Sequence, residues 1–389
     1  MKVLCLCVPG VGHIAMMVPV VQELQRAGHE VRMATGPDFC PQIESSGVVA
    51  VPAGPTRAVA RAERLRRHPD SVDVSPEEQQ AFHVPKVWGG IYAPATFADL
   101  APVVEEWRPD LLVYDVASFS GPLLAELAEI PGVSHAFGPS FPAAVLTSAE
   151  AELSPLWNAH GRPVPPGGGM LDSPHIDVWP ASLQLPDGFR PKAVTPVRVT
   201  GTGRPGGLYA TEVPASLTTL PHPVVHVTLG TVFNHDTPLF ALVIEALRDE
   251  GLSLVVTTGP DQDPSVLGAQ PPSVRVERFL PHHALLPYCD LVVSHSGAGT
   301  TLAALGHGIP SLLLPQAADG FRAAEGCVRA GAGLRLTPAE VTEDAVRRSV
   351  RELIDDPGYR HKAGKLRAEI ARMPEPADVV ERLEALARG

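Results

Sequence analysis

The sequence lacks the signals of a secreted or membrane protein. No apolar run is long enough to cross a bilayer, and the chain does not open with a charged segment followed by a long apolar one. Residues 2–8 instead predict a β-strand, so we expect a cytoplasmic protein. Basic residues number 31 against 43 acidic ones, and the arginines are scattered, which argues against a nucleic-acid partner.

Cysteine is also scarce. The five cysteines are odd in number and widely spaced, and none has the spacing of a metal finger, so we expect free thiols in a reducing compartment. The remaining composition, 44% hydrophobic and 19% charged, suits a compact globular enzyme. A chain of 389 residues is too long for one ordinary core and predicts two domains.

Each half of the chain predicts the same architecture. A strand, an amphipathic helix and a second strand follow one another over residues 3–35, and the pattern restarts at residue 224. Between them, residues 206–220 lie in a Gly-, Pro-, Thr- and Ser-rich stretch that predicts a linker. The predicted fold class is therefore α/β, with two Rossmann-like domains at residues 1–205 and 221–376 facing each other across a cleft.

One further stretch has no sustained apolar period. Residues 56–84, which are rich in arginine, predict an irregular surface segment that could serve as a binding loop or simply be solvated.

The most informative motif lies at residues 291–306, which read as strand, glycine-rich turn and helix. Gly297 and Gly299 lack a Cβ, so their amides can approach a ligand closely. The N–H groups at the start of the following helix point back at the turn, and an exposed His295 adds a donor, which together predict a diphosphate site. The backbone can also approach the ligand closely at the glycine that follows residue 229. The predicted diphosphate-binding residues are Gly230, Thr231, His295, Gly297, Ala298, Gly299 and Thr300.

Residues 10–15 match the dinucleotide fingerprint G-x-G-x-x-A, and Asp38 could be the ribose partner of an NAD-dependent oxidoreductase. The histidine at position 13 and the stronger phosphate motif in the second half argue against that function. His13 is better interpreted as a general base that removes a proton from an acceptor hydroxyl.

A general base of this kind works best beside a carboxylate that fixes its tautomer. Asp115 ends another predicted strand of the same domain, and the carboxyl ends of parallel strands meet at one edge. The alternatives are that His13 caps a helix at the surface and that Asp115 caps the helix after Ser118.

These motifs together resemble the nucleotide-sugar glycosyltransferases of family 1, which have the GT-B fold. The strongest likeness runs from His295 to Asp319, and it extends through residues 9–13, 177–180, 227–231 and 278–281. In particular, the chain resembles actinobacterial enzymes that attach deoxysugars to macrolide, enediyne and aromatic polyketide aglycones.

The resemblance assigns roles in the second domain. It implies that Phe279 stacks on the pyrimidine base and that the Leu280 backbone pairs with the edge of that base. Asp319 would hydrogen-bond sugar hydroxyls. Relatives that use glucose commonly have glutamine at the next position, where this chain has Gly320, so the resemblance implies a deoxysugar.

In the first domain, the resemblance supports His13 and Asp115 as base and supporting acid, and it implies that a C-terminal helix at about residues 377–389 packs back on this domain. The acceptor would lie against aromatic side chains near the loops, which the sequence cannot separate from ordinary core residues. The candidates are Trp88, Tyr92, Phe119 and Phe141, with Phe82 and Phe137 as further aromatic residues.

We therefore predict an inverting glycosyltransferase that moves a sugar from a dTDP- or UDP-sugar to a hydrophobic natural product by in-line displacement. No cofactor or metal is expected, because Asp261 and Asp263 read as a solvated turn. The alternatives are a sugar-nucleotide epimerase of the same fold and a non-catalytic nucleotide-sugar-binding protein. A homodimer, the type of glycosidic bond and the identities of sugar and aglycone are left open.

Overall fold

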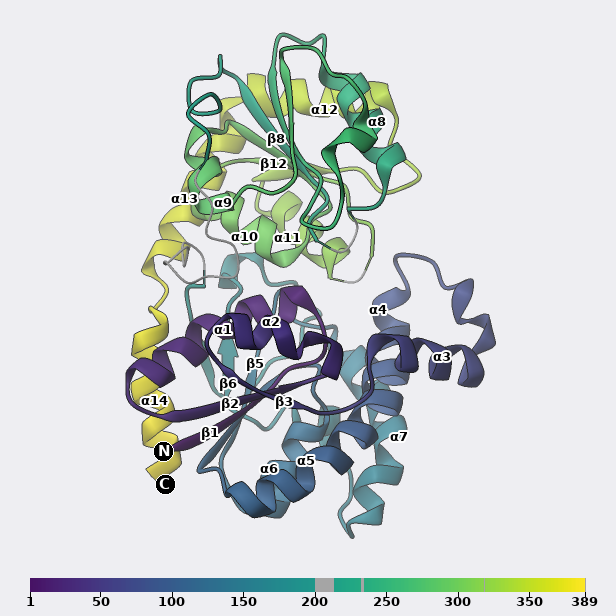
Figure 1. Cartoon of the computed structure of the whole chain (residues 1–389), viewed down its shortest axis with the longest axis vertical. Coiled ribbons are helices and arrows are strands. Elements are labelled where there is room, and N and C mark those ends of the chain that lie inside the picture. The colour runs from purple at the N-terminus through teal and green to yellow at the C-terminus, as the bar shows by residue number, and fades with distance from the viewer. Residues whose placement is uncertain (200–212, 232–233, 318, 389) are drawn as a thin grey trace. The chain divides into compact units, whose positions relative to one another are not determined.

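The computed structural model describes residues 1–199, 213–231, 234–317 and 319–388. The chain forms two compact units (Figure 1). The first unit comprises Met1–Trp179, Gln184–Val199 and Met373–Gly389, and the second comprises Pro180–Leu183 and Thr200–Arg372. Residues 206–212 of the predicted linker lie outside the described residues.

The first unit is built on a seven-stranded parallel sheet in the order β3-β2-β1-β4-β5-β6-β7. Its strands are short apolar runs, and β4 is buried along its whole length, as expected of a sheet covered on both faces. The strands are β1 (Lys2–Leu6), β2 (Glu30–Thr35), β3 (Val49–Pro52), β4 (Leu111–Asp115), β5 (Gly132–His135), β6 (His175–Asp177) and β7 (Val194–Pro196).

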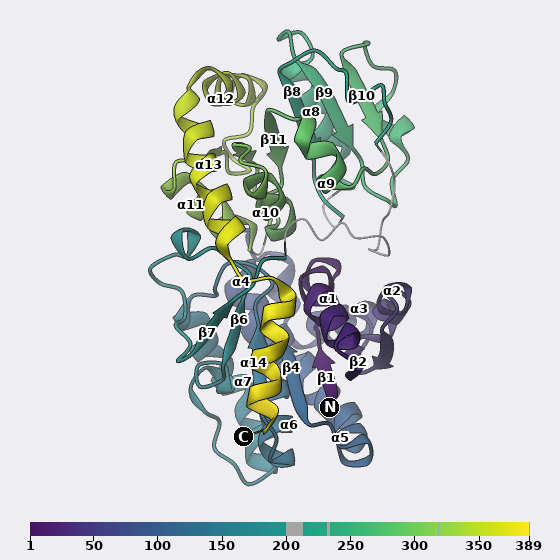
Figure 2. The same ribbon diagram turned by 90° about the vertical axis from the view of Figure 1, so that its left-hand side faces the viewer.

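Helices connect and cover these strands. The C-terminal helix α14 packs on α1 (Figure 2). The His29 Nε2 lies 3.0 Å from the Glu384 Oε1. The helices of the first unit are α1 (Val11–Arg26), η1 (Pro37–Phe39), α2 (Cys40–Ser45), α3 (Arg57–Arg67), η2 (Pro69–Val72), α4 (Gln79–Phe82), the π-helix η3 (His83–Tyr92), α5 (Ala93–Trp107), α6 (Ser120–Ala128), α7 (Ala143–Ala159), η4 (Pro166–Gly169) and α14 (Pro376–Arg388).

The prediction of an irregular segment at residues 56–84 was wrong. Residues 57–67 form α3, and the Thr56 hydroxyl caps this helix by accepting from the Val59 N–H at 3.3 Å. Glu63 then pairs with Arg66 and Arg67 one turn further along. Capping and ion pairs stabilise this helix, while only Ala60 is buried, which is why no apolar period marked it in the sequence.

The second unit contains a six-stranded parallel sheet in the order β10-β9-β8-β11-β12-β13. Its strands are β8 (Val224–Thr228), β9 (Ser253–Thr257), β10 (Val274–Glu277), β11 (Leu291–Ser294), β12 (Ser311–Leu313) and β13 (Gly333–Arg335). Its helices are η5 (Ala181–Leu183), α8 (Thr237–Leu247), η6 (Pro264–Leu267), α9 (His282–Leu285), η7 (Leu286–Tyr288), α10 (Ala298–Gly306), α11 (Gly320–Arg329), α12 (Glu343–Asp355) and α13 (Pro357–Arg372).

Two parallel sheets flanked by helices confirm the predicted α/β fold class. In each sheet the strand order reverses between two central strands, β1 and β4 in the first unit and β8 and β11 in the second. Ligands of such folds bind where the loops diverge at this reversal. Across the described part of the chain, we find no helix with the length and apolarity needed to span a membrane.

Candidate active site

His13 and Asp115 meet at the strand reversal of the first unit. His13 lies in the first turn of α1 just beyond β1, and Asp115 is the last residue of β4. The His13 Nδ1 lies 2.6 Å from the Asp115 Oδ2, and the Oδ1 accepts from the Ala117 N–H at 2.7 Å. A carboxylate can only accept, so the Nδ1 of a neutral His13 ring carries the proton and the Nε2 is left with a lone pair.

The two side chains differ in exposure. The Asp115 side chain is fully buried, whereas 14% of the His13 side chain is exposed. A substrate can therefore reach His13 and not Asp115. This arrangement suits a base whose partner only orients it and stabilises its charged form.

Trp88 and Phe137 contact the His13 ring, and Phe141 contacts both of them; we call these three residues the aromatic wall. Phe137 stacks on His13 with ring centroids 3.7 Å apart, and Trp88 meets it edge-on at 5.5 Å. Phe141 lies 5.7 Å from Phe137 and 6.0 Å from Trp88. Phe137 and Phe141 are buried, whereas Trp88 is half-buried, so Trp88 is the member of the wall that offers apolar surface to a hydrophobic acceptor beside the base.

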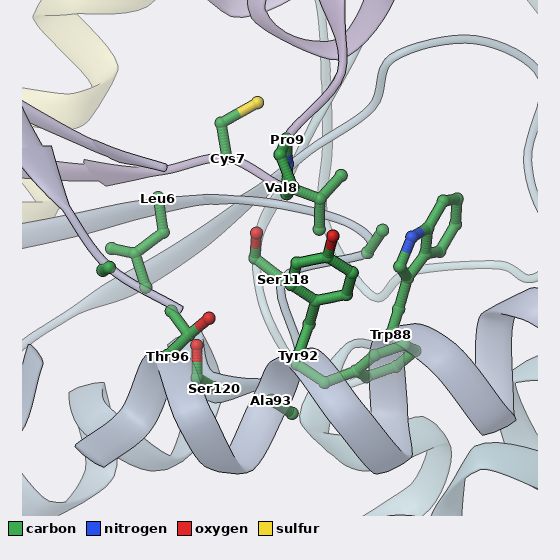
Figure 3. Close-up of a pocket in the computed structure, with 13 residues that line it drawn as sticks. Leu6, Cys7, Val8, Pro9, Trp88, Tyr92, Ala93, Thr96, Ser118 and Ser120 are labelled. Carbon is green, nitrogen blue, oxygen red and sulfur yellow. The ribbon is translucent and has the colours of Figure 1, made fainter. Parts of the chain in front are cut away.

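The other aromatic candidates lie elsewhere. Tyr92 and Phe119 line a pocket with Trp88 and with residues 6–9 and 117–120. Figure 3 shows the Tyr92 and Trp88 side chains rising from the same helix toward Val8. Phe119 is completely buried, so it serves as core, and Phe82 contacts His68 and His83.

Two residues behind Asp115 were not expected from the sequence. The Cys7 Sγ lies 3.9 Å from the Asp115 Oδ2, and burial, with the carboxylate nearby, raises the pKa of this thiol. Burial lowers the pKa of His135, on the neighbouring strand β5, to about 4. Both groups are therefore neutral near pH 7. The sequence signal that could have identified them is their position at the carboxyl ends of two strands, Cys7 just after β1 and His135 as the last residue of β5.

In the second unit, the predicted diphosphate turn follows β11. The helix α10 begins at Ala298 after Gly297, so the N–H groups of Ala298, Gly299 and Thr300 lie in its first turn, where no intrahelical acceptor exists. Ser296 has a φ of 61°, a left-handed conformation that is costly for a residue other than glycine. Its buried Oγ has no hydrogen-bond partner among the described residues. A strained turn with unused donors is what an anion-binding site provides.

His295 lies beside Gly230 and Gly297. A Cβ at Gly230 would lie 2.4 Å from the His295 Cε1, and one at Gly297 would lie 2.3 Å from the Nε2. These glycines therefore make room for the imidazole ring. The sequence had predicted only that they let the backbone approach a ligand closely. The prediction of an exposed His295 was wrong, because the side chain is half-buried. Burial lowers the pKa of His295 to about 4, so it offers a hydrogen bond and no charge near pH 7.

The predicted sugar-binding residues adjoin this turn. Asp319 directly precedes α11, and a Cβ at Gly320 would lie 3.1 Å from the His295 carbonyl oxygen. Gly320 therefore lets the start of α11 pack against the diphosphate turn. Thr231 follows Gly230 after β8 and is half-buried. Phe279 and Leu280 follow β10, where Phe279 is half-buried and Leu280 belongs to the hydrophobic core.

The predicted solvated turn at Asp261 and Asp263 is a capping structure. The Asp263 Oδ1 accepts from the Ser265 N–H at 2.8 Å at the start of η6, and its Oδ2 lies 3.7 Å from the Arg278 Nη2. Within the described ranges, no three His, Cys, Asp or Glu side chains gather as a metal site would require.

Comparison with known proteins places this architecture in a family. Residues 22–202 match the N-terminal domain, and residues 243–386 the C-terminal domain, of the family described as erythromycin biosynthesis protein CIII-like. The L-demethylnoviosyl transferase of Streptomyces niveus is 35% identical over 99% of this chain and 98% of the relative.

Two solved structures share the fold over nearly the whole length. Glycosyltransferase VinC in complex with dTDP is 26% identical, with a TM-score of 0.79 and coverage of 100% of both chains. The spinosyn rhamnosyltransferase SpnG complexed with spinosyn aglycone is 27% identical, with a TM-score of 0.81 over 99% of this chain and 100% of that one. The chain belongs to the erythromycin biosynthesis protein CIII-like family and is a glycosyltransferase with the GT-B fold.

Proposed function

We propose that this glycosyltransferase moves a deoxysugar from a dTDP- or UDP-sugar to a hydroxyl group of a hydrophobic natural product, with inversion at the anomeric carbon. The observation that carries the proposal is the 2.6 Å contact between His13 and Asp115 beside the aromatic wall. The names of the relatives, and the dTDP and the aglycone bound by VinC and SpnG, support the two substrate classes.

In this mechanism the His13 Nε2 removes the proton of the acceptor hydroxyl while that oxygen attacks the anomeric carbon. The bond from that carbon to the diphosphate breaks on the opposite face, so the configuration inverts. Asp115 stabilises the imidazolium that forms, because its negatively charged Oδ2 already accepts a hydrogen bond from the Nδ1. The proton is later released to solvent from the Nε2.

The leaving diphosphate acquires negative charge as the bond breaks. The N–H groups at the start of α10 supply the positive end of the helix dipole, and His295 and Thr231 add hydrogen bonds. Since His295 is neutral near pH 7, the electrostatic share of this stabilisation comes from the helix end.

The sugar would contact Asp319 at the start of α11. Gly320 offers no side chain to the sugar, and the next residue is the apolar Phe321. A site in which Asp319 is followed by glycine and phenylalanine suits a sugar that has lost hydroxyl groups. A sugar hydroxyl that found no polar side chain to bind would be buried without a hydrogen bond.

The direct test is product analysis with a panel of dTDP- and UDP-sugars and macrolide or aromatic polyketide acceptors. Mass spectrometry should detect the glycosylated acceptor, and NMR should show an anomeric configuration opposite to that of the donor. Retention of configuration would overturn the single-displacement mechanism. Conversion of the donor into an epimer without any acceptor would instead support the epimerase alternative.

A further inference from the structure

The pocket of the first unit shown in Figure 3 is a small cavity beside the base. It is lined mainly by residues at and after the end of β1, by residues of η3 and α5, and by the segment that leads from β4 into α6. Trp88 lines this cavity and also meets the His13 ring edge-on at 5.5 Å. The cavity and the base therefore adjoin the same tryptophan side chain.

The cavity has room for one small group. The space open to the centre of a water molecule is about 10 Å³, which corresponds to about one water-sized occupant. Pro9, Trp88 and Thr96 are half-buried, whereas the other lining residues are buried, so an occupant would enter from the side of these three residues. A ring is too large for this space, but a substituent that projects from a ring can enter it.

The lining offers hydroxyl groups and no charge. Figure 3 draws the hydroxyls of Tyr92, Thr96, Ser118 and Ser120 around the cavity. Within the described part of the chain, no acidic or basic side chain lines it. Burial raises the pKa of Tyr92 and of Cys7, so these two groups also stay neutral near pH 7. The lining therefore suits a neutral polar occupant, because a charged one would be buried without a counter-charge.

The Ser120 hydroxyl lacks a partner in this lining. Ser120 is 1% exposed, and its Oγ makes no hydrogen bond with any described residue. A serine at the start of a helix commonly caps it, but no side-chain cap is formed at the start of α6. Burial of an unpaired hydroxyl is unfavourable, and a polar group that entered the cavity would supply the missing hydrogen bond.

The start of α6 favours one kind of polar group. The helix begins at Ser120, so the positive end of its dipole lies at the cavity. This end attracts an oxygen with partial negative charge more than it attracts an amine. A carbonyl oxygen only accepts, and the Ser120 hydroxyl can rotate to donate to it because no described residue holds its proton.

We propose that this cavity is a subsite for one carbonyl oxygen of the acceptor and that Ser120 donates a hydrogen bond to that oxygen. The proposal rests on the proposed function, in which the acceptor hydroxyl faces His13. A ring that lies on Trp88 would place its carbonyl oxygen in the cavity and its hydroxyl at the base. The subsite would thus select acceptors that carry a ketone and determine which of their hydroxyls receives the sugar.

The test measures the binding of two small bicyclic alcohols. In hydroxytetralone the hydroxyl and the ketone lie at opposite ends of the saturated ring, and tetralol lacks the ketone. The wild-type protein should bind hydroxytetralone about twofold to tenfold more tightly than tetralol, the net worth of one hydrogen bond between neutral groups. Ser120→Ala should remove this preference by weakening the binding of hydroxytetralone alone. Calorimetry without donor measures both affinities, so the result does not depend on sugar transfer.

Ser71→Ala is the control for the loss of a buried hydroxyl. Ser71 is 7% exposed, its Oγ also has no partner among the described residues, and it does not line the cavity. This variant should keep the preference. Ser120→Val, which fills the cavity with methyl groups, should weaken the binding of hydroxytetralone more than Ser120→Ala does. Melting temperatures show which variants fold, and the preference of the wild-type protein is a readout that needs no variant.

The outcomes separate this proposal from the proposed function. Equal affinity of the wild-type protein for both compounds, or binding of neither, would overturn the subsite. A preference that persists in Ser120→Ala, or an equal loss of affinity for both compounds, would overturn the role of Ser120. If His13→Ala keeps its turnover with an aliphatic alcohol, the base assignment fails, whereas the binding preference is decided separately. If His13→Ala loses turnover and the preference is absent, the base stands and the subsite fails.

Discussion

His13 occupies a position where three constraints act on one ring. Asp115 accepts a hydrogen bond from the Nδ1, Phe137 covers one face, and Trp88 meets the edge. The ring therefore has little rotational freedom, and the Nε2 is the nitrogen that is free of the carboxylate. Restricting a base in this way lowers the entropy cost of reaching the reactive geometry.

His13→Ala should lower kcat with an aliphatic alcohol by roughly a hundredfold or more, the usual scale of general-base catalysis. Asp115→Asn should also cost rate, because the amide would favour the wrong tautomer. The double variant should be little worse than His13→Ala, since the two residues act as a unit. Steady-state kinetics and calorimetry with dTDP should show lost turnover with normal nucleotide affinity.

A matched control comes from the same unit. His29 also pairs with a carboxylate, Glu384, at 3.0 Å, so His29→Ala removes a comparable pair without touching the site. Its turnover per folded molecule should remain close to normal. Near-normal turnover of His13→Ala on an unactivated alcohol would place the base elsewhere.

In the second unit, His295 and Asp319 should affect different parts of the donor. His295→Ala should weaken binding of free dTDP and of the dTDP-sugar alike, because its ring lies among Gly230 and Gly297 of the diphosphate turn. Asp319→Ala should weaken binding of the dTDP-sugar alone, since it precedes α11 on the sugar side. Isothermal calorimetry with both ligands measures this difference, and equal losses for Asp319→Ala would show that its assignment is wrong.

At the scale of elements, the strands were the most predictable part. The strand ends that carry Asp115 and His295 follow buried apolar runs, and parallel strands bring such ends to one edge. The helix α3 was missed because its stability comes from a cap and ion pairs. The sequence also could not separate the half-buried Trp88 from the buried Phe119, because the direction of the Trp88 ring depends on the π-helix η3 and on packing.

Two buried histidines, His135 on β5 and His175 on β6, make the stability of the first unit depend on pH. Burial lowers the pKa of His135 to about 4 and of His175 to about 3, below the ordinary 6.5. The unfolded chain binds protons at these sites more readily, so their contribution is full above pH 6.5 and is lost as pH falls toward the folded-state pKa values.

We therefore expect urea unfolding to show lower stability of the first unit at pH 5 than at pH 7. His175→Asn should reduce this pH-dependent loss by about 2 kcal/mol, whatever it does to the stability at pH 7. Burial raises the pKa of Asp177 to about 6, which acts in the opposite direction, so Asp177→Asn should increase the loss at low pH. An unchanged difference between the two pH values in His175→Asn would contradict this account.

For the whole molecule, sequence periodicity predicted two α/β units but could not predict every passage of the chain between them. The sequence suggested one linker and, by resemblance, the return of the C-terminal helix. The structure adds the passage at residues 180–183. Such a short excursion has no compositional signal, because its four residues, Pro-Ala-Ser-Leu, are defined by what they contact, namely α11 and α13.

The net charge of the whole molecule bears on the last prediction, which is that activity needs no divalent metal. The net charge of −12 repels an anionic donor at long range, so positive potential must be local. The first turn of α10 provides that potential, while the carboxylate most like a metal ligand, Asp263, is already used to cap η6 and pair with Arg278. Turnover should therefore persist in EDTA, and Asp263→Asn should retain it.

Added Mg²⁺ should act on this enzyme only as an ordinary salt. Screening of the repulsion between the acidic protein and the donor should lower the donor KM modestly, and NaCl at matched ionic strength should do the same. The measurement is initial rate against Mg²⁺ and against NaCl after EDTA treatment. If EDTA abolishes turnover and Mg²⁺ restores it where NaCl does not, then the helix end is insufficient and a bound metal must neutralise the leaving diphosphate.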